Sequence, residues 1–195
     1  MHENSYNTMA DFKNKYLKGK FNLKVLDLGS LDINGSYKPI FYEHEYKGLD
    51  IMEGKNVDIK IPYPYQWDNV KKDYYDVIVS GQTLEHIEDD MRFVKEAARV
   101  LKPEGIICFI APSTGPLHME LDYRRYTVET LSQLAIVNGL TILECNHNPH
   151  GVWQDITLIA QKPLNAIKME QPNDEPATST FEPPKRGRPS KIKLG

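Results

Sequence analysis

The stretch VLDLGSLDINGSY, residues 25–37, decides the fold of this 195-residue chain. Its apolar half has the composition of a β-strand. It ends in Gly29 and Ser30, whose small size lets the backbone approach a ligand closely, and Asn34-Gly35 then favours a tight turn before a following helix. The stretch contains neither the G-x-G-x-x-G of a dinucleotide site nor the G-K-[ST] of a phosphate loop. Taken alone, it fits an ordinary strand-to-helix turn as well as a ligand-binding turn.

Around this stretch, short apolar segments alternate with helical patterns as far as residue 162. Helices are expected at 89–101, ended by Pro103 and Gly105, and between a Thr127 cap and Asn138. Alternation of this kind predicts βαβ units, and hence a doubly wound α/β fold with a mostly parallel sheet and helices on both faces. The expected strands after the first are 46–51, 57–61, 75–80, 106–111, 140–144 and 152–160.

The second expected strand ends at Asp50, 21 residues beyond Gly29. An acid about 20 residues after a glycine turn is well placed to accept hydrogen bonds from two ribose hydroxyls. The alternative for Asp50 alone is a solvated turn acid. Because Asp50 and Gly29 both follow strands, they are expected at one rim of the sheet, where they suit a nucleoside without a bound pyrophosphate.

Four segments together resemble the class I S-adenosylmethionine-dependent methyltransferases. They are VLDLGSLDINGSY (25–37), YKGLDI with GKNVDI (46–51 and 54–59), YDVIVSGQTLEHIED (75–89) and ARVLKPEGIICFIAPS (98–113). The third and fourth are especially similar to small members assigned to small-molecule or glycan substrates. The family often has G-x-G-x-G, whereas here Gly35 is the next glycine after Gly29. A branch with D-x-G-S-x-D-x-N-G-S-Y is similar to this version.

The resemblance implies a Rossmann-like, seven-stranded methyltransferase domain at 21–162, after an N-terminal helix or extension at 1–20. It implies S-adenosylmethionine as cofactor. The implied contacts are the methionine end at Asp27, Gly29 and Ser30, the ribose at Asp50, adenine beside Ile51, Asp58 and Ile59, and the amino or carboxylate end near Ser80 and Gly81.

The acceptor side is expected after the fourth and fifth strands, in LEHIED (84–89) and APSTGPLHMELDYRRYT (111–127). Breaks in regular structure at a strand's carboxyl end suit a pocket, and arginine offers a planar fork to a carboxylate or phosphate. In the alternative, Asp122 and Arg125 form a local ion pair and the tyrosines pack on the sheet. A general base is needed only for an acceptor that must lose a proton. The candidates are His118, Asp122, Tyr126 and His86, with Glu85 and Tyr123 beside them; His86 is equally suited to capping a helix.

The last 33 residues, 163–195, differ from the rest in composition and charge. They hold six basic and four acidic residues, against 18 and 23 in the preceding 162. This proline-rich stretch has too few large apolar residues to fold, so a disordered linker is expected. Residues 184–191 are similar to an AT-hook, whose arginines enter a narrow A·T minor groove. A generic basic tail is the alternative. The residues expected to contact DNA are Lys185, Arg186, Gly187, Arg188, Pro189 and Lys191.

Composition excludes several classes. The longest apolar run is six residues, far below the roughly 20 that cross a bilayer, and no secretory signal is visible. Cys108 and Cys145 have no metal-ligand spacing, so no metal site is expected, and NHNPHG (146–151) does not make one either. A cytoplasmic methyltransferase for an oxygen or nitrogen acceptor is predicted. The alternatives are a DNA-binding accessory protein with a silent methyltransferase-like domain, or a nucleic-acid methyltransferase.

Overall fold

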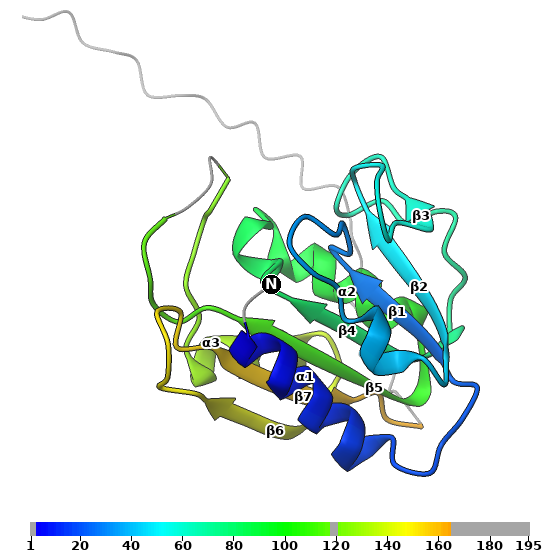
Figure 1. Cartoon of the computed structure of the whole chain (residues 1–195). Coiled ribbons are helices and arrows are strands. Elements are labelled where there is room, and N and C mark those ends of the chain that lie inside the picture. The colour runs from blue at the N-terminus through cyan, green and yellow to red at the C-terminus, as the bar shows by residue number, and fades with distance from the viewer. Residues whose placement is uncertain (1–2, 118–120, 165–195) are drawn as a thin grey trace, which may run out of the picture.

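The computed structural model describes residues 3–117 and 121–164. Within them a seven-stranded sheet has the order β3-β2-β1-β4-β5-β7-β6 (Figure 1). The strands from β3 to β5 in this order are parallel, and β7 runs antiparallel to both β5 and β6. The mostly parallel α/β fold is confirmed. The strands are β1 (Lys24–Leu28), β2 (Glu45–Asp50), β3 (Ile59–Lys60), β4 (Tyr75–Gly81), β5 (Leu101–Ala111), β6 (Thr141–His147) and β7 (Ile156–Gln161).

Helices cover both faces of this sheet. The helix α1 (Glu3–Tyr16) crosses one face, whereas α2 (Asp90–Val100) and α3 (Val128–Val137) lie behind it in Figure 1. The near-continuous apolar strand β5 serves both sides: Ile107 and Phe109 pack with α2 and α3, and Cys108 and Ile110 pack with α1. Successive strand residues point to opposite faces of the sheet, so a strand that is covered on both faces must be apolar throughout.

The predicted helix boundaries agree closely with the structure. Thr127 caps α3 by accepting a hydrogen bond from the Thr130 amide, and Gly139 follows with φ +76°. Asp89 caps α2 in the same way, through the Arg92 amide. No helix among the described residues is long and apolar enough to cross a membrane.

Two connections differ from expectation. No α-helix lies between β1 and β2, where the chain makes the 3-10 helix η1 (Lys38–Phe41). The Asp32 carboxylate turns the backbone by accepting from the Gly35 amide at 2.8 Å, and few residues then remain before β2. Strand β5 begins at Leu101 rather than 106, since Tyr75 pairs with Leu101 and Val77 with Ile106. Pro103 lies in the unpaired excursion between those pairs, where its missing amide hydrogen costs no ladder bond.

Candidate functional site

The carboxyl ends of β1, β2 and β4 meet where the strand order changes direction. From β1 the chain proceeds outward to β2 and β3, then returns to place β4 on the other side of β1. Ligands of doubly wound sheets bind outside the carboxyl ends of the strands at such a switch point. Gly29, Asp50 and Gly81 end or follow these three strands, so the structure brings the predicted residues to one rim.

Asp50 fixes the loop that follows β1. Its two carboxylate oxygens accept from the Leu31 amide at 3.0 Å and the Met52 amide at 2.9 Å. The Gly29 amide donates to the Leu49 carbonyl at 2.9 Å, which joins the ends of β1 and β2. A carboxylate has about four acceptor positions, so two remain for a ligand's hydroxyls. Ile51 beside it is 45% exposed and offers an apolar surface at the rim.

The glycines at the rim are closely packed by the protein itself. A Cβ at Gly29 would overlap the Thr83 side chain, and Gly29 has φ +73°. A Cβ at Gly81 would overlap the hydroxyl of Tyr37. These glycines therefore serve internal packing. At Gly29 the Thr83 side chain occupies part of the space that was expected to be open to a ligand.

The loop between β2 and β3 is held by Ser30 and Asp58, and Ile59 begins β3. The Ser30 hydroxyl donates to the Asn56 carbonyl at 3.2 Å, and the Asn56 amide group returns a bond to the Ser30 carbonyl at 3.1 Å. Asp58 accepts from the Gly48 amide at 2.9 Å and pairs with Lys47 at 3.3 Å, which lowers the pKa of its carboxyl despite partial burial. Asp58 precedes β3, and thus lies before the rim rather than on it.

Asp27 and Ser80 lie beneath the rim. Asp27 is buried and accepts from the Tyr46 hydroxyl; burial raises the pKa of its carboxyl to about 7, because the charged form loses its hydration. The Ser80 hydroxyl donates to the Leu28 carbonyl at 2.9 Å and ties β4 to β1. The contact between Tyr46 and Asp27 was not predicted, because nothing in the sequence pattern connects these two residues.

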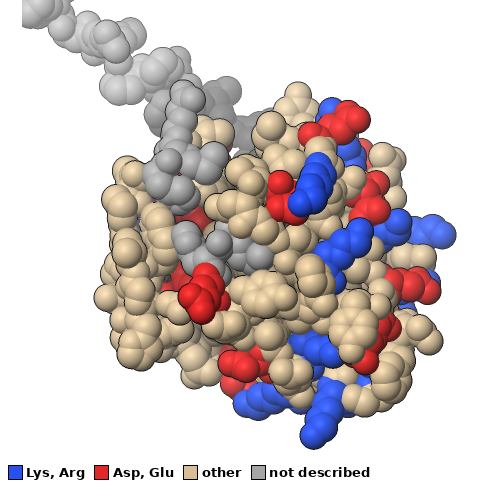
Figure 2. Space-filling model, viewed as in Figure 1, with Lys and Arg blue, Asp and Glu red and all other residues tan. Residues whose placement is uncertain are grey.

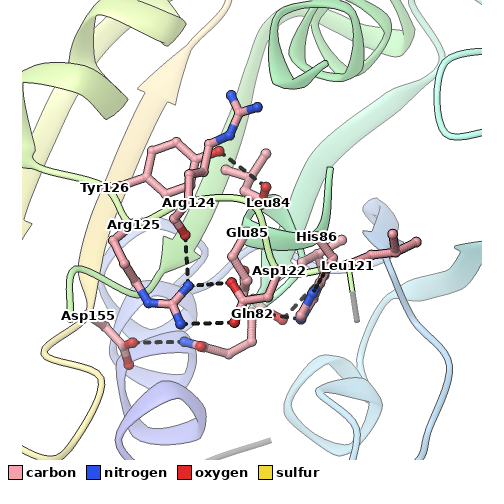
Figure 3. A network of polar contacts seen from close by, with 12 residues as sticks. Gln82, Leu84, Glu85, His86, Leu121, Asp122, Arg124, Arg125, Tyr126 and Asp155 are labelled. Carbon is pink, nitrogen blue, oxygen red and sulfur yellow. Dashed lines mark hydrogen bonds and ion pairs between the residues drawn. The ribbon is translucent and has the colours of Figure 1, made fainter. Parts of the chain in front are cut away.

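A polar cluster forms where the segments after β4 and β5 meet the start of β7 (Figure 3). Arg125 binds both oxygens of Asp122, one through Nη2 at 2.9 Å, and Nη2 also donates to the Pro116 carbonyl at 2.8 Å. Gln82 donates to Asp155 at 2.8 Å. The ion pair expected as the alternative is present, whereas neither Gln82 nor Asp155 was among the predicted site residues. We define the polar cluster as Gln82, Glu85, His86, Asp122, Arg125 and Asp155.

Glu85 has the most unusual environment in the cluster. Its side chain is 0% exposed, and neither carboxylate oxygen has a hydrogen-bond partner among the described residues. Burial raises the pKa of this carboxyl to about 8, and neighbouring Asp122 adds to the shift, while Arg125 opposes it. Strongly shifted groups cluster at functional sites.

The other predicted acid–base residues are held by hydrogen bonds. His86 Nδ1 lies 2.6 Å from the Leu121 carbonyl, and must donate to it. The buried Tyr126 hydroxyl donates to Asp90 at 2.9 Å and braces the start of α2. His147 contacts the Ser113 hydroxyl at 3.4 Å. His118 lies outside the described residues, as does the AT-hook-like segment 184–191.

Comparison with known proteins supports a methyltransferase-like chain. Residues 65–109 match the model of a methyltransferase domain. Two chloroplastic 2-methyl-6-phytyl-1,4-hydroquinone methyltransferases of Oryza sativa subsp. japonica are 39% and 38% identical over 72 and 71 residues, or 37% and 36% of this chain. The matched part spans only 17% and 18% of those relatives' own length.

Solved structures match over most of the chain. The 1,6-didemethyltoxoflavin-N1-methyltransferase of Burkholderia thailandensis, solved with S-adenosylhomocysteine, has a TM-score of 0.65 at 17% identity, covering 83% of this chain and 79% of that one. A sarcosine dimethylglycine methyltransferase described for Galdieria sulphuraria has 0.63 at 15%, covering 81% and 86%. The [4+2]-cyclase SpnF also has 0.63, at 14%, covering 81% and 82%. These likenesses show that this chain shares the Rossmann-like fold of those proteins.

Proposed function

We propose that this chain is an S-adenosylmethionine-dependent methyltransferase. The observation that carries the proposal is the placement of Asp50 beside the Gly29 turn at the topological switch point, with two acceptor positions of its carboxylate still available. The methyltransferase-domain match at 65–109 supports the proposal independently, because it includes β4, the third strand that ends at the rim.

The residues present fit a nucleoside cofactor. Asp50 would accept from the ribose hydroxyls, and the exposed Ile51 would pack on the adenine. The backbone at Gly29, Gly81 and Gln82 would face the amino-acid end. Asp58 is already engaged by Gly48 and Lys47, so any contact with adenine would have to compete with those bonds. When bound, the cofactor supplies a methyl group activated by a sulfonium charge.

The protein's own contribution is alignment. Holding a nucleophile and an electrophile in line replaces a bimolecular encounter, and effective molarity alone can lower a barrier by several kcal/mol. The backbone at Gly29 and Gly81, packed tightly against Thr83 and Tyr37, would offer a rigid edge for the cofactor. The polar cluster after β4 and β5 would lie on the acceptor side, where it would orient an oxygen or nitrogen of a small molecule or glycan.

Calorimetry tests this function directly. Titration with S-adenosylhomocysteine should show one site, and Asp50→Asn should weaken binding at least tenfold because an amide cannot accept from both hydroxyls. Asp68→Asn, an exposed aspartate away from the rim, is the matched control and should bind normally. Absence of binding by the unaltered chain would refute the proposal and favour a catalytically silent domain. The test is decisive because a protein with different chemistry, the [4+2]-cyclase SpnF, shares the fold.

The acceptor requires a separate measurement. Cell extract incubated with the purified chain and isotopically labelled S-adenosylmethionine, then analysed by mass spectrometry, should reveal a labelled small molecule or glycan. Label recovered only in nucleic acid would favour the nucleic-acid methyltransferase alternative. The acidic composition of residues 1–162 argues against that outcome.

A tether to A·T-rich DNA is a second proposal and rests on KRGRPSK at 185–191 alone. Arginines flanking a glycine suit a narrow minor groove, and the lysines suit phosphates. Fluorescence anisotropy with an A·T-rich duplex should show binding that Arg186→Ala with Arg188→Ala abolishes. Equal affinity of the double variant would refute the tether without affecting the proposed enzyme activity.

A further inference from the structure

The inference concerns Glu85 and deepens the proposed function, on which it rests. Glu85 lies in the 3-10 helix η2 (Leu84–His86), just beyond β4, and its backbone carbonyl accepts from the Tyr123 amide at 2.8 Å. This bond places the segment after β5 directly against Glu85. A buried carboxylate without a hydrogen bond is costly, because it loses hydration and gains no partner. Among the described residues nothing offsets that cost, so burial favours the protonated carboxyl unless a ligand supplies a positive charge or an N–H group.

The charges around Glu85 define what that partner is. Among the described residues Glu85 is faced by two further carboxylates, Asp122 and Asp155, by the guanidinium of Arg125 and by the imidazole of His86. Both Nη atoms of Arg125 are already bound to Asp122 and to the carbonyls of Pro116 and Arg124; only its Nε lacks a partner. The fork expected to grip an acceptor's carboxylate or phosphate is therefore in use. The cluster repels anions and favours a cation or an N–H donor.

We propose that the methyl acceptor is an amine, and that the carboxylate of Glu85 binds its nitrogen and removes a proton from it. In the first step one N–H bond of the ammonium group breaks and the proton joins Glu85, which leaves a neutral nitrogen with a lone pair. That lone pair forms the new N–C bond while the C–S bond of the sulfonium breaks and its electron pair returns to sulfur. The products are a methylated ammonium and a neutral thioether.

His86 offers the proton a way out. Its Nδ1 donates to the Leu121 carbonyl, so in the neutral ring Nε2 carries the basic lone pair. This Nε2 lies 3.8 Å from Glu85 Oε1, and the His86 side chain is 22% exposed. His86 thus lies between the buried carboxylate and solvent, and at this separation a proton would pass between the two side chains through a water molecule.

The surroundings of the cluster fit an amine on an apolar body. Leu117, Leu121 and Val152 are 72%, 57% and 65% exposed, and each belongs to a segment bonded to the cluster or to its neighbours. Figure 2 shows Lys and Arg over the right and lower parts of this face, while the charged side chains visible on its left part are acidic. Exposed apolar side chains beside a cluster rich in carboxyl groups favour an apolar molecule that carries one amino group.

Three compounds with the same ring test the class: benzylamine, phenol and benzoate, titrated into the full chain saturated with S-adenosylhomocysteine. Benzylamine should bind at least tenfold more tightly than phenol, and benzoate should not bind measurably. Glu85→Gln should weaken benzylamine binding at least tenfold and leave S-adenosylhomocysteine binding unchanged. Glu45→Gln is the matched control, because Glu45 is exposed and begins β2, at the end of the strand away from the rim. This variant should change neither benzylamine binding nor S-adenosylhomocysteine binding.

A measurement on the unaltered chain makes the test independent of whether the variant folds. Because the pKa of Glu85 is raised to about 8, an ammonium that binds its ionised form at pH 7 should release close to one proton. Titrations in phosphate and Tris, whose ionisation heats differ, measure that proton. The release should fade as pH rises above 8.

The outcomes separate the two ideas. Tighter binding of phenol or benzoate, no proton release, or an unaffected Glu85→Gln variant would overturn the amine inference. Loss of S-adenosylhomocysteine binding by the unaltered chain would instead overturn the proposed methyltransferase function.

Discussion

At the scale of single residues, the rim has its shape because neighbouring side chains occupy the space beside its glycines. At position 81 only glycine fits, because the Tyr37 hydroxyl occupies the space that a Cβ would need. This hydroxyl is also hydrogen-bonded to Ser5 of α1 at 2.5 Å. The residue that ends β4 is thereby linked to the N-terminal helix. A sequence motif identifies Gly81 as a possible ligand contact, but only the packing reveals this second reason for a glycine.

Gly81→Ala should destabilise the fold by about 1–3 kcal/mol, the usual cost of overpacking. Tyr37→Phe removes the clashing oxygen, so the double variant should be less destabilised than the sum of the single ones, by at least about 0.5 kcal/mol. Urea denaturation measures all three. Gly139→Ala is the control: with φ +76° and no atom within 4 Å of its added Cβ, it should show only the backbone penalty of about 1 kcal/mol. Strict additivity of Gly81→Ala and Tyr37→Phe would contradict the contact.

Asp27 makes stability depend on pH. Burial raises the pKa of this carboxyl from 3.8 to about 7, so the folded state holds more protons than the unfolded state between those values. Its contribution to stability therefore falls as pH rises from about 4 to 7, by on the order of 4 kcal/mol at full ionisation. Asp27→Asn should gain stability relative to the unaltered chain between pH 5 and pH 8, measured by urea denaturation. A difference that stays constant with pH would argue against a buried, neutral Asp27.

At the scale of elements, periodicity predicted what lies in regular strands and helices and failed where tertiary contacts decide. Cap residues placed α3 correctly, and the continuous apolar run in β5 predicted burial on both faces. The missing helix after β1 was not predictable, because loop contacts such as the Asp32 amide to the Lys55 carbonyl replace helical bonds there. Likewise Gly29 and Asp50 were predictable from spacing, whereas Asp155 joins the polar cluster only through the closing turn before β7.

The cap of α3 gives a quantitative test at this scale. Thr127 and Thr130 each accept from the other's backbone amide, at 3.2 and 2.9 Å. Thr127→Ala should lower the free energy of unfolding by about 1 kcal/mol, whereas Thr127→Ser keeps the accepting oxygen and should cost far less. Chemical denaturation of the two variants compares them directly. Equal losses would mean that the methyl group's packing, rather than the cap, holds this end of the helix.

At the scale of the whole molecule, charge divides the chain into unlike parts. Residues 1–162 carry 18 basic and 23 acidic side chains, a net charge of −5, and residues 163–195 carry six and four, a net charge of +2. A duplex is attracted to the second part and repelled by the first, over about 10 Å at 0.1 M salt. The proposed enzyme site and the proposed DNA contact are therefore electrostatically opposed.

This opposition predicts that a peptide of residues 163–195 binds an A·T-rich duplex at least as tightly as the full chain does. The difference should shrink as salt screens the repulsion, and five basic groups in residues 185–193 limit the slope of log K against log salt to about −4.5. Anisotropy titrations from 50 to 300 mM salt, with a G·C-rich duplex as control, measure both quantities. If the full chain bound more tightly and with a steeper slope, residues 1–162 would be supplying phosphate contacts. The duplex itself would then return as a candidate acceptor, against the amine inferred from the polar cluster.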